Sequence, residues 1–264
     1  MTYKPKKQLG QNFLIDKGVI EKMIIQGGIT KNDTILEIGP GQGSLTYALF
    51  SNAKKVIAVE KDNKLYNYLL KKFEAIKNVE FVNGDILEYL KKQKNKKAKK
   101  QRYKVIGNIP YYLTSHLLRE LLALENKPSE IILMVQKEVA ERLIAKKGKM
   151  NLLAISVQVF AEPEILFYVS KDSFWPKPKV DSAVIKLKVY KVCKVENPEE
   201  FLKLVHAGFG AKRKLLSNNL AKGLGVSKEK IYDIFRVVGI DIKARAQDLS
   251  VKDWTEIYKI ITQI

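Results

Sequence analysis

The sequence predicts an α/β protein with a Rossmann-like sheet and helices on both faces, followed by a small all-helical domain. Short runs rich in β-branched residues alternate with helical periods along most of the chain, which is the pattern of βαβ units. A glycine-rich turn at residues 37–43 follows the first strong strand. After about residue 192 the strand-like runs cease. We therefore expect a sheet domain at 1–192 and a helical domain at 193–264.

The elements of the sheet domain follow one another in a regular order. Asp16 opens a helix that buries Ile20, Met23 and Ile24, and the glycine pair at 27–28 ends it. Five strand-like runs come next, with helical patterns between most of them. Two late runs, which are joined by a proline-rich loop, are expected to form a closing hairpin at the edge of the sheet. The expected strands span 34–38, 55–60, 79–83, 103–107, 130–135, 165–169 and 182–189.

The helical domain is predicted from its caps. Asn197 and Pro198 form an N-cap and first-turn pair. Ser227 caps a second helix that ends at Gly239. Ser250 precedes a third amphipathic helix and has an acidic residue three positions later, as in a capping box.

The charge of the chain points to an anionic partner. The 264 residues contain 48 Lys and Arg against 28 Asp and Glu, a net charge of +20. A charge of this size favours polyanions, with nucleic acid ahead of an anionic membrane. No stretch approaches the ~18 consecutive apolar residues of a spanning helix, and no apolar signal-type segment follows the start MTYKPKK. These features predict a soluble, cytoplasmic protein.

Metal chemistry is not expected. Cys193 is the only cysteine, so it cannot form an internal disulfide, and His116 and His206 are the only histidines. These residues lack the clustered spacing of a zinc site.

The segment EIGPGQG is expected to be a turn between a strand and a helix. Gly39, Gly41 and Gly43 would let the backbone turn tightly and approach a ligand closely, although an ordinary βα turn has the same composition. Glu60, at the end of the second strand, can accept hydrogen bonds from both hydroxyls of an adenosine ribose. Asp85 ends the third strand, where a carboxylate could accept from an adenine amine; taken alone it is typical of a helix N-cap. Together these residues predict an adenosine-bearing cofactor.

NAD and S-adenosylmethionine are the two candidate cofactors. The glycines run G-P-G-Q-G rather than G-x-G-x-x-G, and Ser44 stands where a dinucleotide-binding turn has its third glycine. This difference favours S-adenosylmethionine.

The segment GNIPYY follows the fourth strand. Because ligands bind at the carboxyl ends of parallel strands, Asn108 is expected to face the cofactor. Its side-chain carbonyl and a main-chain carbonyl near Ile109 could accept from both N–H bonds of an adenine amine, which favours a pyramidal, nucleophilic nitrogen. Pro110 would stiffen the turn, and Tyr111 would stack on a flipped base. No strong general base is required, so catalysis would rest on proximity and electrostatics.

Six segments follow one another in a characteristic order: GQNFLID (10–16), EIGPGQG, GNIPYY, MVQKEVAERL (134–143), FWPKPKVDSAVIKL (174–187) and GFGAKRKLLSNNL (208–220). This order resembles the ribosomal small-subunit RNA adenine dimethyltransferases, the kasugamycin-sensitivity methyltransferases, over nearly the whole chain. The resemblance implies an S-adenosylmethionine-dependent methyltransferase fold. It also implies N6,N6-dimethylation of two adjacent adenosines in a hairpin near the 3′ end of 16S rRNA.

The resemblance implies roles for single residues. Phe174 is similar to the family's second base-stacking aromatic, although Trp175 beside it could pack in its place. Lys177 replaces the small or polar residue that the family usually has after the first proline. The positions that match cofactor contacts are Asn12, Leu14, Gly39, Gly41, Glu60, Asp85 and Asn108.

Several basic residues are expected to hold RNA phosphates. Lys212, Arg213 and Lys214 follow two glycines at the start of a helix in the small domain. Such a run is commonly only a solvated helix face, but the net charge favours phosphate contact, which weakens steeply with salt. Arg142 and Arg245 are further candidates of the same kind.

The lysine-rich segment 91–104 is expected to be a mobile, solvated loop. It precedes the fourth strand, so it would enter the sheet from the amino ends, opposite the crevice that binds the target. It could hold distant rRNA phosphates or merely keep the loop solvated. We predict that it does not touch the target adenosines.

Two other function classes are compatible with this fold. A macrolide-resistance 23S rRNA methyltransferase shares the Asn-Ile-Pro-Tyr motif, but the G-P-G turn and FWPKPKVDSAV favour the small-subunit enzyme. A non-catalytic nucleic-acid-binding factor could use the same scaffold, but Glu60, Asp85, Asn108 and Tyr111 are all present. The favoured expectation is a monomer that acts on 16S rRNA within a small-subunit assembly intermediate.

Overall fold

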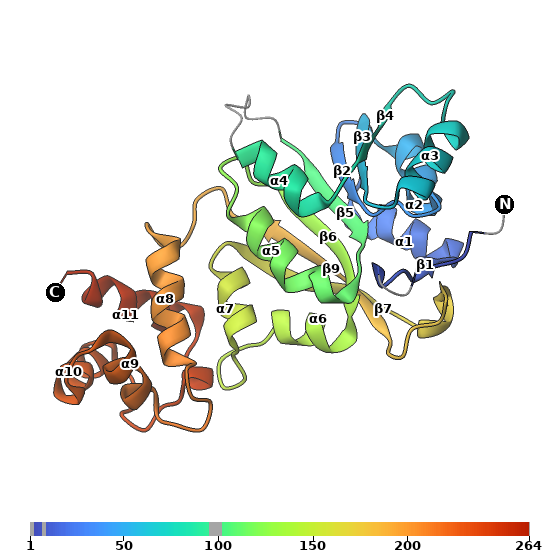
Figure 1. Cartoon of the computed structure of the whole chain (residues 1–264). Coiled ribbons are helices and arrows are strands. Elements are labelled where there is room, and N and C mark those ends of the chain that lie inside the picture. Colours follow the sequence, from blue (N-terminus) through green and yellow to red (C-terminus); the bar gives the residue numbers. More distant parts are fainter. Residues whose placement is uncertain (1–2, 7–8, 95–101, 264) are drawn as a thin grey trace. The chain divides into compact units, whose positions relative to one another are not determined.

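The structure is a computed structural model, and it describes residues 3–6, 9–94 and 102–263. It confirms the predicted fold class, because a mixed sheet flanked by helices is joined to an all-helical region (Figure 1). The local pattern explains this outcome. Alternating strands and helices bury their apolar residues when helices cover both faces of one sheet.

The chain divides into two compact units. We call Met1–Ala140 together with Glu162–Val189 the sheet unit, and Glu141–Ala161 together with Tyr190–Ile264 the helical unit. The sequence places a single boundary after residue 192. In the structure, the segment that precedes the late strands is grouped with the helical tail instead of with the sheet.

The sheet unit is built on a seven-stranded sheet with the order β4-β3-β2-β5-β6-β9-β7. The strands from β4 to β6 in this order are parallel, and β9 is antiparallel to β6. The strand order therefore reverses between β2 and β5. The predicted closing strands, β7 and β9, are neighbours at one edge, although β7 begins at Ala161 rather than at residue 165. The strands are β2 (Thr34–Ile38), β3 (Lys55–Glu60), β4 (Val79–Asn83), β5 (Lys104–Asn108), β6 (Glu130–Gln136), β7 (Ala161–Val169) and β9 (Ser182–Val189).

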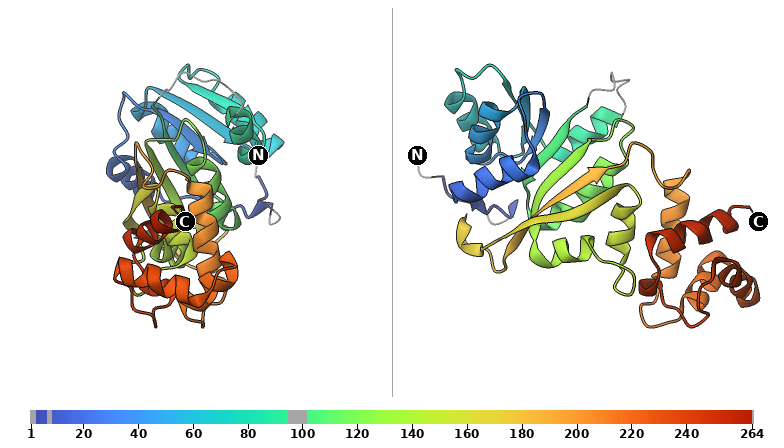
Figure 2. Two further views of the ribbon diagram at one scale, coloured as in Figure 1. Left: turned by 90° about the vertical axis from the view of Figure 1, so that its left-hand side faces the viewer. Right: turned by 180° about the vertical axis from the view of Figure 1, so that it is seen from behind.

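Helices cover both faces of the sheet. α1 and α2 pack together on one face, and α4 and α5 pack together on the other (Figures 1 and 2). Asp16 caps α1 as predicted, by accepting a hydrogen bond from the Val19 N–H, and Gly28 ends the helix in the left-handed conformation. Met23 and Leu49 are fully buried in the core, and each such side chain contributes about 1.5–3 kcal/mol. The helices are α1 (Lys17–Gly27), α2 (Ser44–Asn52), α3 (Asn63–Lys72), α4 (Ile86–Lys94), α5 (Thr114–Leu122) and α6 (Lys137–Leu143).

The sequence did not predict a second, two-stranded sheet. β1 (Phe13–Leu14) pairs antiparallel with β8 (Phe174–Trp175), so that Phe13 lies opposite Trp175 and Leu14 opposite Phe174. Figure 1 shows β1 next to the loop that follows β7. Strands of two residues have no detectable alternation, and only the folded chain brings these distant segments together. The pairing attaches the segment before α1 to the proline-rich loop.

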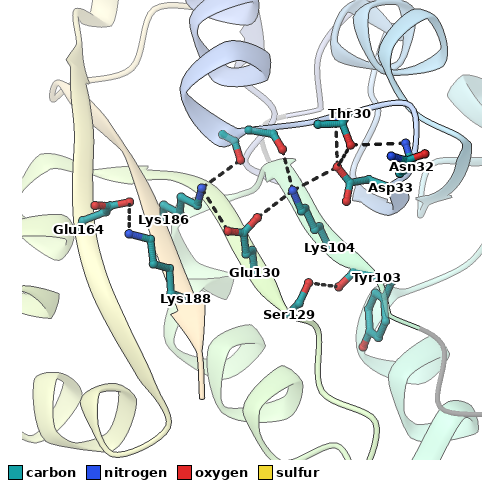
Figure 3. Close-up of polar contacts among 12 residues, drawn as sticks. Thr30, Asn32, Asp33, Tyr103, Lys104, Ser129, Glu130, Glu164, Lys186 and Lys188 are labelled. Carbon is teal, nitrogen blue, oxygen red and sulfur yellow. Dashed lines mark hydrogen bonds and ion pairs between the residues drawn. The ribbon is translucent and has the colours of Figure 1, made fainter. Parts of the chain in front are cut away.

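A buried ion-pair network joins α1 to the amino ends of the strands (Figure 3). Lys104 Nζ donates to the Gly28 carbonyl at 2.6 Å and lies 3.1 Å from Asp33 Oδ2 and 2.9 Å from Glu130 Oε2. Lys186 Nζ lies 3.2 Å from Glu130 Oε1. Burial opposes the ionisation of Glu130, but the two lysines outweigh it and lower its pKa. The lysines also face the carboxyl end of α1, where the helix dipole favours a positive charge.

The two ends of segment 91–104 are not part of a solvated loop, contrary to the prediction from the sequence. Lys91 belongs to α4, where it pairs with Glu88, and Lys104 is a buried residue of β5 rather than part of a solvated loop. Residues 95–101, the centre of the predicted loop, lie outside the described residues. The segment does lead into the amino end of β5, as expected.

The helical unit confirms the predicted caps. The side chain of Asn197 caps its helix with Pro198 in the first turn, and Ser227 caps the helix that ends at Gly239. Ser250 forms the predicted capping box. The helices of this unit are α7 (Leu152–Gln158), α8 (Pro198–Gly208), α9 (Leu216–Leu224), α10 (Lys228–Val238) and α11 (Val251–Ile261).

The core of the helical unit is aromatic. Trp254, Phe201 and Phe235 are its largest fully buried side chains. A β-carbon at Gly208 would lie 2.2 Å from the Trp254 ring, so only glycine lets α8 approach α11 this closely.

Candidate active site

A cavity of about 280 Å³ opens at the carboxyl ends of β2, β3 and β5. It lies where the strand order reverses, which is where ligands bind to open α/β sheets. Phe13, Lys61 and His116 also line it without having been predicted. Phe13 lies between the predicted contacts Asn12 and Leu14, and Lys61 directly follows Glu60, so their neighbours could have indicated these two; His116 had no such signal. Most predicted cofactor and base contacts also line it: Asn12, Leu14, Gly39, Gly41, Glu60, Asp85, Asn108, Pro110 and Tyr111.

The glycine turn has the geometry that its composition predicts. Gly39, Gly41 and Gly43 have φ values of 65°, 59° and 80°, in the left-handed region that favours glycine. A β-carbon at Gly41 would lie 3.0 Å from the Phe13 ring, and one at Gly43 would lie 2.7 Å from the Phe73 ring. The turn therefore brings bare backbone to the cavity wall, directly before α2 begins.

Glu60 connects the glycine turn to β3. Its Oε2 accepts from the Gly41 N–H at 3.0 Å, and its Oε1 accepts from the Asp62 N–H at 2.8 Å. Burial raises the pKa of Glu60, and these hydrogen bonds partly offset the effect. Each carboxylate oxygen can accept a second hydrogen bond. The carboxylate can therefore receive two hydroxyls from the cavity without losing its main-chain partners.

Asp85 bonds to the first turn of α4, as the N-cap interpretation expects, and it also lines the cavity. Its Oδ1 accepts from the Leu87 N–H at 2.8 Å in the first turn of α4, and its Oδ2 lies 2.8 Å from Lys61 Nζ. Burial opposes the ionisation of Asp85, but the bonds from Lys61 and the main chain outweigh it and lower its pKa. Asp85 is therefore an ionised acceptor at the cavity wall.

The side chain of Asn108 is oriented by a hydrogen bond to Asn12, in the segment before α1. Its Nδ2 donates to the Asn12 carbonyl at 2.8 Å, which fixes the amide so that Oδ1 is its remaining acceptor. Among the described residues, no protein group donates to that oxygen. The preceding Gly107 is required by close packing, since a β-carbon there would lie 2.7 Å from the Ile38 carbonyl oxygen. The amide oxygen is thus available to a ligand.

The two predicted stacking aromatics have different environments. Tyr111, in the 3₁₀ turn Tyr111–Leu113, is half-buried and hydrogen-bonded to Ser182 Oγ at 2.8 Å, and burial raises its pKa. Phe174 is only 3% exposed and lies in the core, outside the cavity wall. Because side chains alternate along a strand, Phe174 points inward with Leu14 while Trp175 is left outside. The structure therefore does not bring Phe174 to the predicted base site.

The N-terminal segment is held across β3 and the start of α3. Tyr3 Oη lies 3.0 Å from Asp62 Oδ2 and 3.1 Å from Gln11 Oε1. Lys6 Nζ lies 2.5 Å from the same Asp62 oxygen. These contacts position the stretch that carries Asn12 and Phe13 along the cavity.

The predicted phosphate-binding residues belong to the helical unit and are exposed. Lys212, Arg213 and Lys214 lie in the turn before α9 rather than within a helix. The Leu216 N–H donates to the carbonyl of residue 244 at 2.9 Å, so this turn lies beside Arg245. Arg142, in the last turn of α6, is also exposed.

Within residues 3–6, 9–94 and 102–263, no three or more His, Cys, Asp or Glu side chains are grouped closely enough to hold a metal ion. In the same part of the chain, no helix combines the length and the apolar character needed to cross a bilayer.

Comparison with known proteins gives consistent relatives. The model of the family described as "Ribosomal RNA adenine dimethylase" matches residues 2–263. A protein from Dehalococcoides mccartyi strain CBDB1, named ribosomal RNA small subunit methyltransferase A, is 41% identical over 97% of this chain and 88% of its own length. A protein of the same name from Fusobacterium nucleatum is 42% identical over 98% of both chains.

Solved structures show the same architecture. A dimethyladenosine transferase from Plasmodium falciparum aligns with a TM-score of 0.81 and 26% identity, over 95% of this chain and 98% of its own. The 23S rRNA methyltransferase ErmE aligns with a TM-score of 0.76 over 96% of this chain and 100% of its own, but its 24% identity supports a common fold only.

Proposed function

Because the chain belongs to the ribosomal RNA adenine dimethylase family, we propose that it dimethylates N6 of two adjacent adenosines near the 3′ end of 16S rRNA. The observation that carries this proposal is a single cavity with two kinds of acceptor. Glu60, Asp85 and Asn108 all line the cavity. Glu60 ends β3 and Asp85 follows β4, whereas Asn108 ends β5, which lies beyond β2 in the strand order. The first pair suits an adenosine-bearing methyl donor, and the amide suits a target amine.

Glu60, Asp85 and the other predicted cofactor contacts fit S-adenosylmethionine. Glu60 would accept the ribose hydroxyls, and the ionised Asp85 would accept the adenine amine. The main chain of Gly39 and Gly41 leaves room for close approach, while Asn12 and Leu14 close the cavity from the N-terminal segment. When bound, the cofactor supplies a methyl group on a positively charged sulfur, which is already an activated electrophile. We therefore propose that transfer requires no metal ion.

Asn108 would act on the target amine. Its free Oδ1 can accept one N–H of the adenine amine, which reduces delocalisation of the nitrogen lone pair into the ring. Tyr111 would stack on the base, held in place by Ser182, and Pro110 restricts the turn between them. The proton on the alkylated nitrogen is acidic and passes to solvent, so no strong base is assigned. Phe174 has a supporting role, because its burial against Leu14 holds β1 and therefore Asn12.

The helical unit would supply the RNA phosphate contacts. Lys212, Arg213, Lys214 and Arg245 form one exposed basic surface around the start of α9, and we add Arg142 from α6. Neutralising phosphates releases counterions, so binding through these residues weakens as salt rises. We propose that the protein acts in the cytoplasm as a monomer on a small-subunit assembly intermediate.

The decisive experiment is incubation of the protein with tritiated S-adenosylmethionine and, in parallel reactions, undermethylated small subunits or naked 23S RNA, followed by mapping of the modified nucleotides and an RNA-binding assay. Label at N6 of two adjacent adenosines near the 3′ end of 16S rRNA supports the proposal. Label in naked 23S RNA instead would assign the chain to the resistance activity. RNA binding without any methyl transfer would indicate a non-catalytic factor.

A further inference from the structure

Trp175 is the outermost ring of a small aromatic stack beside the cavity. In the β1–β8 ladder, Leu14 and Phe174 point into the core, which leaves Phe13 and Trp175 on the opposite face. The Trp175 ring lies nearly parallel to the Phe13 ring, with centroids 6.5 Å apart and an interplanar angle of 23°. Phe13 in turn lines the cavity and meets the ring of Tyr3 edge-on at 5.8 Å.

The burial of the stack is uneven. Phe13 is buried beneath its neighbours, whereas 48% of Trp175 is exposed. Trp175 itself does not line the cavity. The Trp175 ring packs beside a buried partner, and this contact restricts its conformational freedom before any ligand binds. It can therefore accept a planar ligand at little further entropic cost.

The surroundings of Trp175 are cationic. Lys177 and Lys179 are exposed in the loop that follows it, alternating with Pro176 and Pro178. Lys177 forms an ion pair with Asp172, and the cation of Lys179 has no carboxylate partner among the described residues. An exposed aromatic ring flanked by lysines matches the chemistry of an unpaired nucleotide, which offers a base to stack and a phosphate to neutralise.

We propose that Trp175 is a stacking platform for an unpaired RNA nucleotide next to the target adenosine. The inference rests on the proposed function, because it assigns the partner of that same site. The platform cannot be the target-base site itself, since Trp175 lies outside the cavity and Phe13 separates the two. Extruding an adenosine deprives its neighbours of their own stacking partner, and Trp175 replaces it.

The test compares two substitutions that both keep an apolar side chain beside Phe13. Trp175→Leu keeps an apolar side chain over Phe13 but removes the aromatic face, whereas Trp175→Phe keeps a smaller aromatic face. Tyr68→Leu is the matched control, because Tyr68 is 44% exposed and has Lys72 5.5 Å from its ring centroid, but it does not line the cavity. The measured quantities are the KM for undermethylated small subunits, kcat, and the Kd of S-adenosylmethionine.

Trp175→Leu is expected to raise the KM for the particle by about 5- to 150-fold, the range that corresponds to one stacked base. Its kcat and cofactor Kd should stay within twofold of wild type, as should every value for Tyr68→Leu. Trp175→Phe should retain most of the particle affinity. This pattern would establish that the aromatic face, and not merely the cover over Phe13, is what the RNA uses.

Two results would overturn the inference. Unchanged KM in Trp175→Leu would mean that no base stacks there, and a raised cofactor Kd would mean that Trp175 acts through Phe13 on the cofactor side. Both differ from failure of the proposed function, in which the wild-type protein itself transfers no methyl group to any RNA.

Discussion

The side-chain nitrogen of Asn108 donates a 2.8 Å hydrogen bond to the main-chain carbonyl of Asn12, a residue 96 positions earlier in the chain. The bond links the end of β5 to the segment that covers the cavity. It also determines which atom of the amide faces the ligand, since the nitrogen is occupied and the oxygen is not. The proposed chemistry depends on this orientation.

Asn108→Ala should remove most methyl transfer while weakening cofactor binding only slightly, because the lost acceptor matters mainly in the transition state. Loss of one preorganised hydrogen-bonding group of this kind costs about 10²–10³ in rate. Single-turnover methylation and calorimetric binding of S-adenosylmethionine measure the two effects. Asn52→Ala is the control, since the exposed Asn52 amide donates to the Ala48 carbonyl of its own helix. Equal losses of binding and rate would show that Asn108 has been assigned the wrong role.

Glu60→Gln should act on cofactor affinity and leave the rate at saturation nearly unchanged. The substitution removes the charge that receives the ribose hydroxyls, and hydrogen bonds to charged groups contribute about 1.5–3 kcal/mol, or roughly 10- to 150-fold in Kd. Titration calorimetry measures this change directly. Glu80→Gln, on β4 and paired with Lys55 at the surface, should bind as wild type does. A variant with normal affinity and a reduced rate would contradict the assignment.

Glu37 should make the protein less stable as pH rises. Burial raises its pKa from 4.5 to about 8, and although Thr46 donates to Oε2 at 2.7 Å, Oε1 has no partner among the described residues. Between these two pH values the folded state holds a proton that the unfolded state has lost. The free energy of unfolding therefore falls with pH, by up to about 1.4 kcal/mol per pH unit.

Glu37→Gln should remove this dependence, because the amide does not titrate. Urea unfolding at several pH values should show wild type and variant equally stable near pH 4, with the variant increasingly more stable toward pH 8. A stability difference that stays constant across this range would mean that Glu37 is ionised in the folded protein.

Lys104→Ala should destabilise the sheet unit strongly, because it removes the largely buried cation of Asp33 and leaves Glu130 with Lys186 alone. Removing one partner of a buried ion pair costs about 3–5 kcal/mol, which chemical denaturation can measure. Lys55→Ala breaks only an exposed pair with Glu80, for which a loss below about 1 kcal/mol is expected. Similar losses in the two variants would show that the network in Figure 3 is solvated in solution.

Arg213→Ala should weaken binding to small subunits and reduce the steepness of the salt dependence by about one unit per lost phosphate contact. The cofactor Kd should not change, because Arg213 belongs to the helical unit and the cavity to the sheet unit. Filter binding at several salt concentrations measures both the affinity and the slope. Lys222→Ala, an exposed lysine near the end of α9, is the control. An unchanged salt slope would exclude Arg213 from the RNA surface.

The local sequence was sufficient to predict the elements that depend on local physics. Asp16, Ser227 and Ser250 cap helices in the structure as predicted, because an N-cap bonds to N–H groups only two or three residues away. The glycine turn could be predicted for a similar reason, since left-handed backbone angles favour glycine at Gly39 and Gly41. The alternation of strand-like and helix-like hydrophobic patterns predicted the α/β fold class. The order of the six sequence motifs indicated the family.

The tertiary structure decided which distant residues meet. The pairing of β1 with β8 buries Phe174 and leaves Trp175 exposed, a difference between neighbouring rings that the sequence did not indicate. The sequence predicts that Lys104 ends a solvated lysine-rich loop, but in the structure its side chain is buried between Asp33 and Glu130. Contacts of this kind depend on which segments the folded sheet brings side by side, and neither composition nor periodicity along one stretch of chain contains that information.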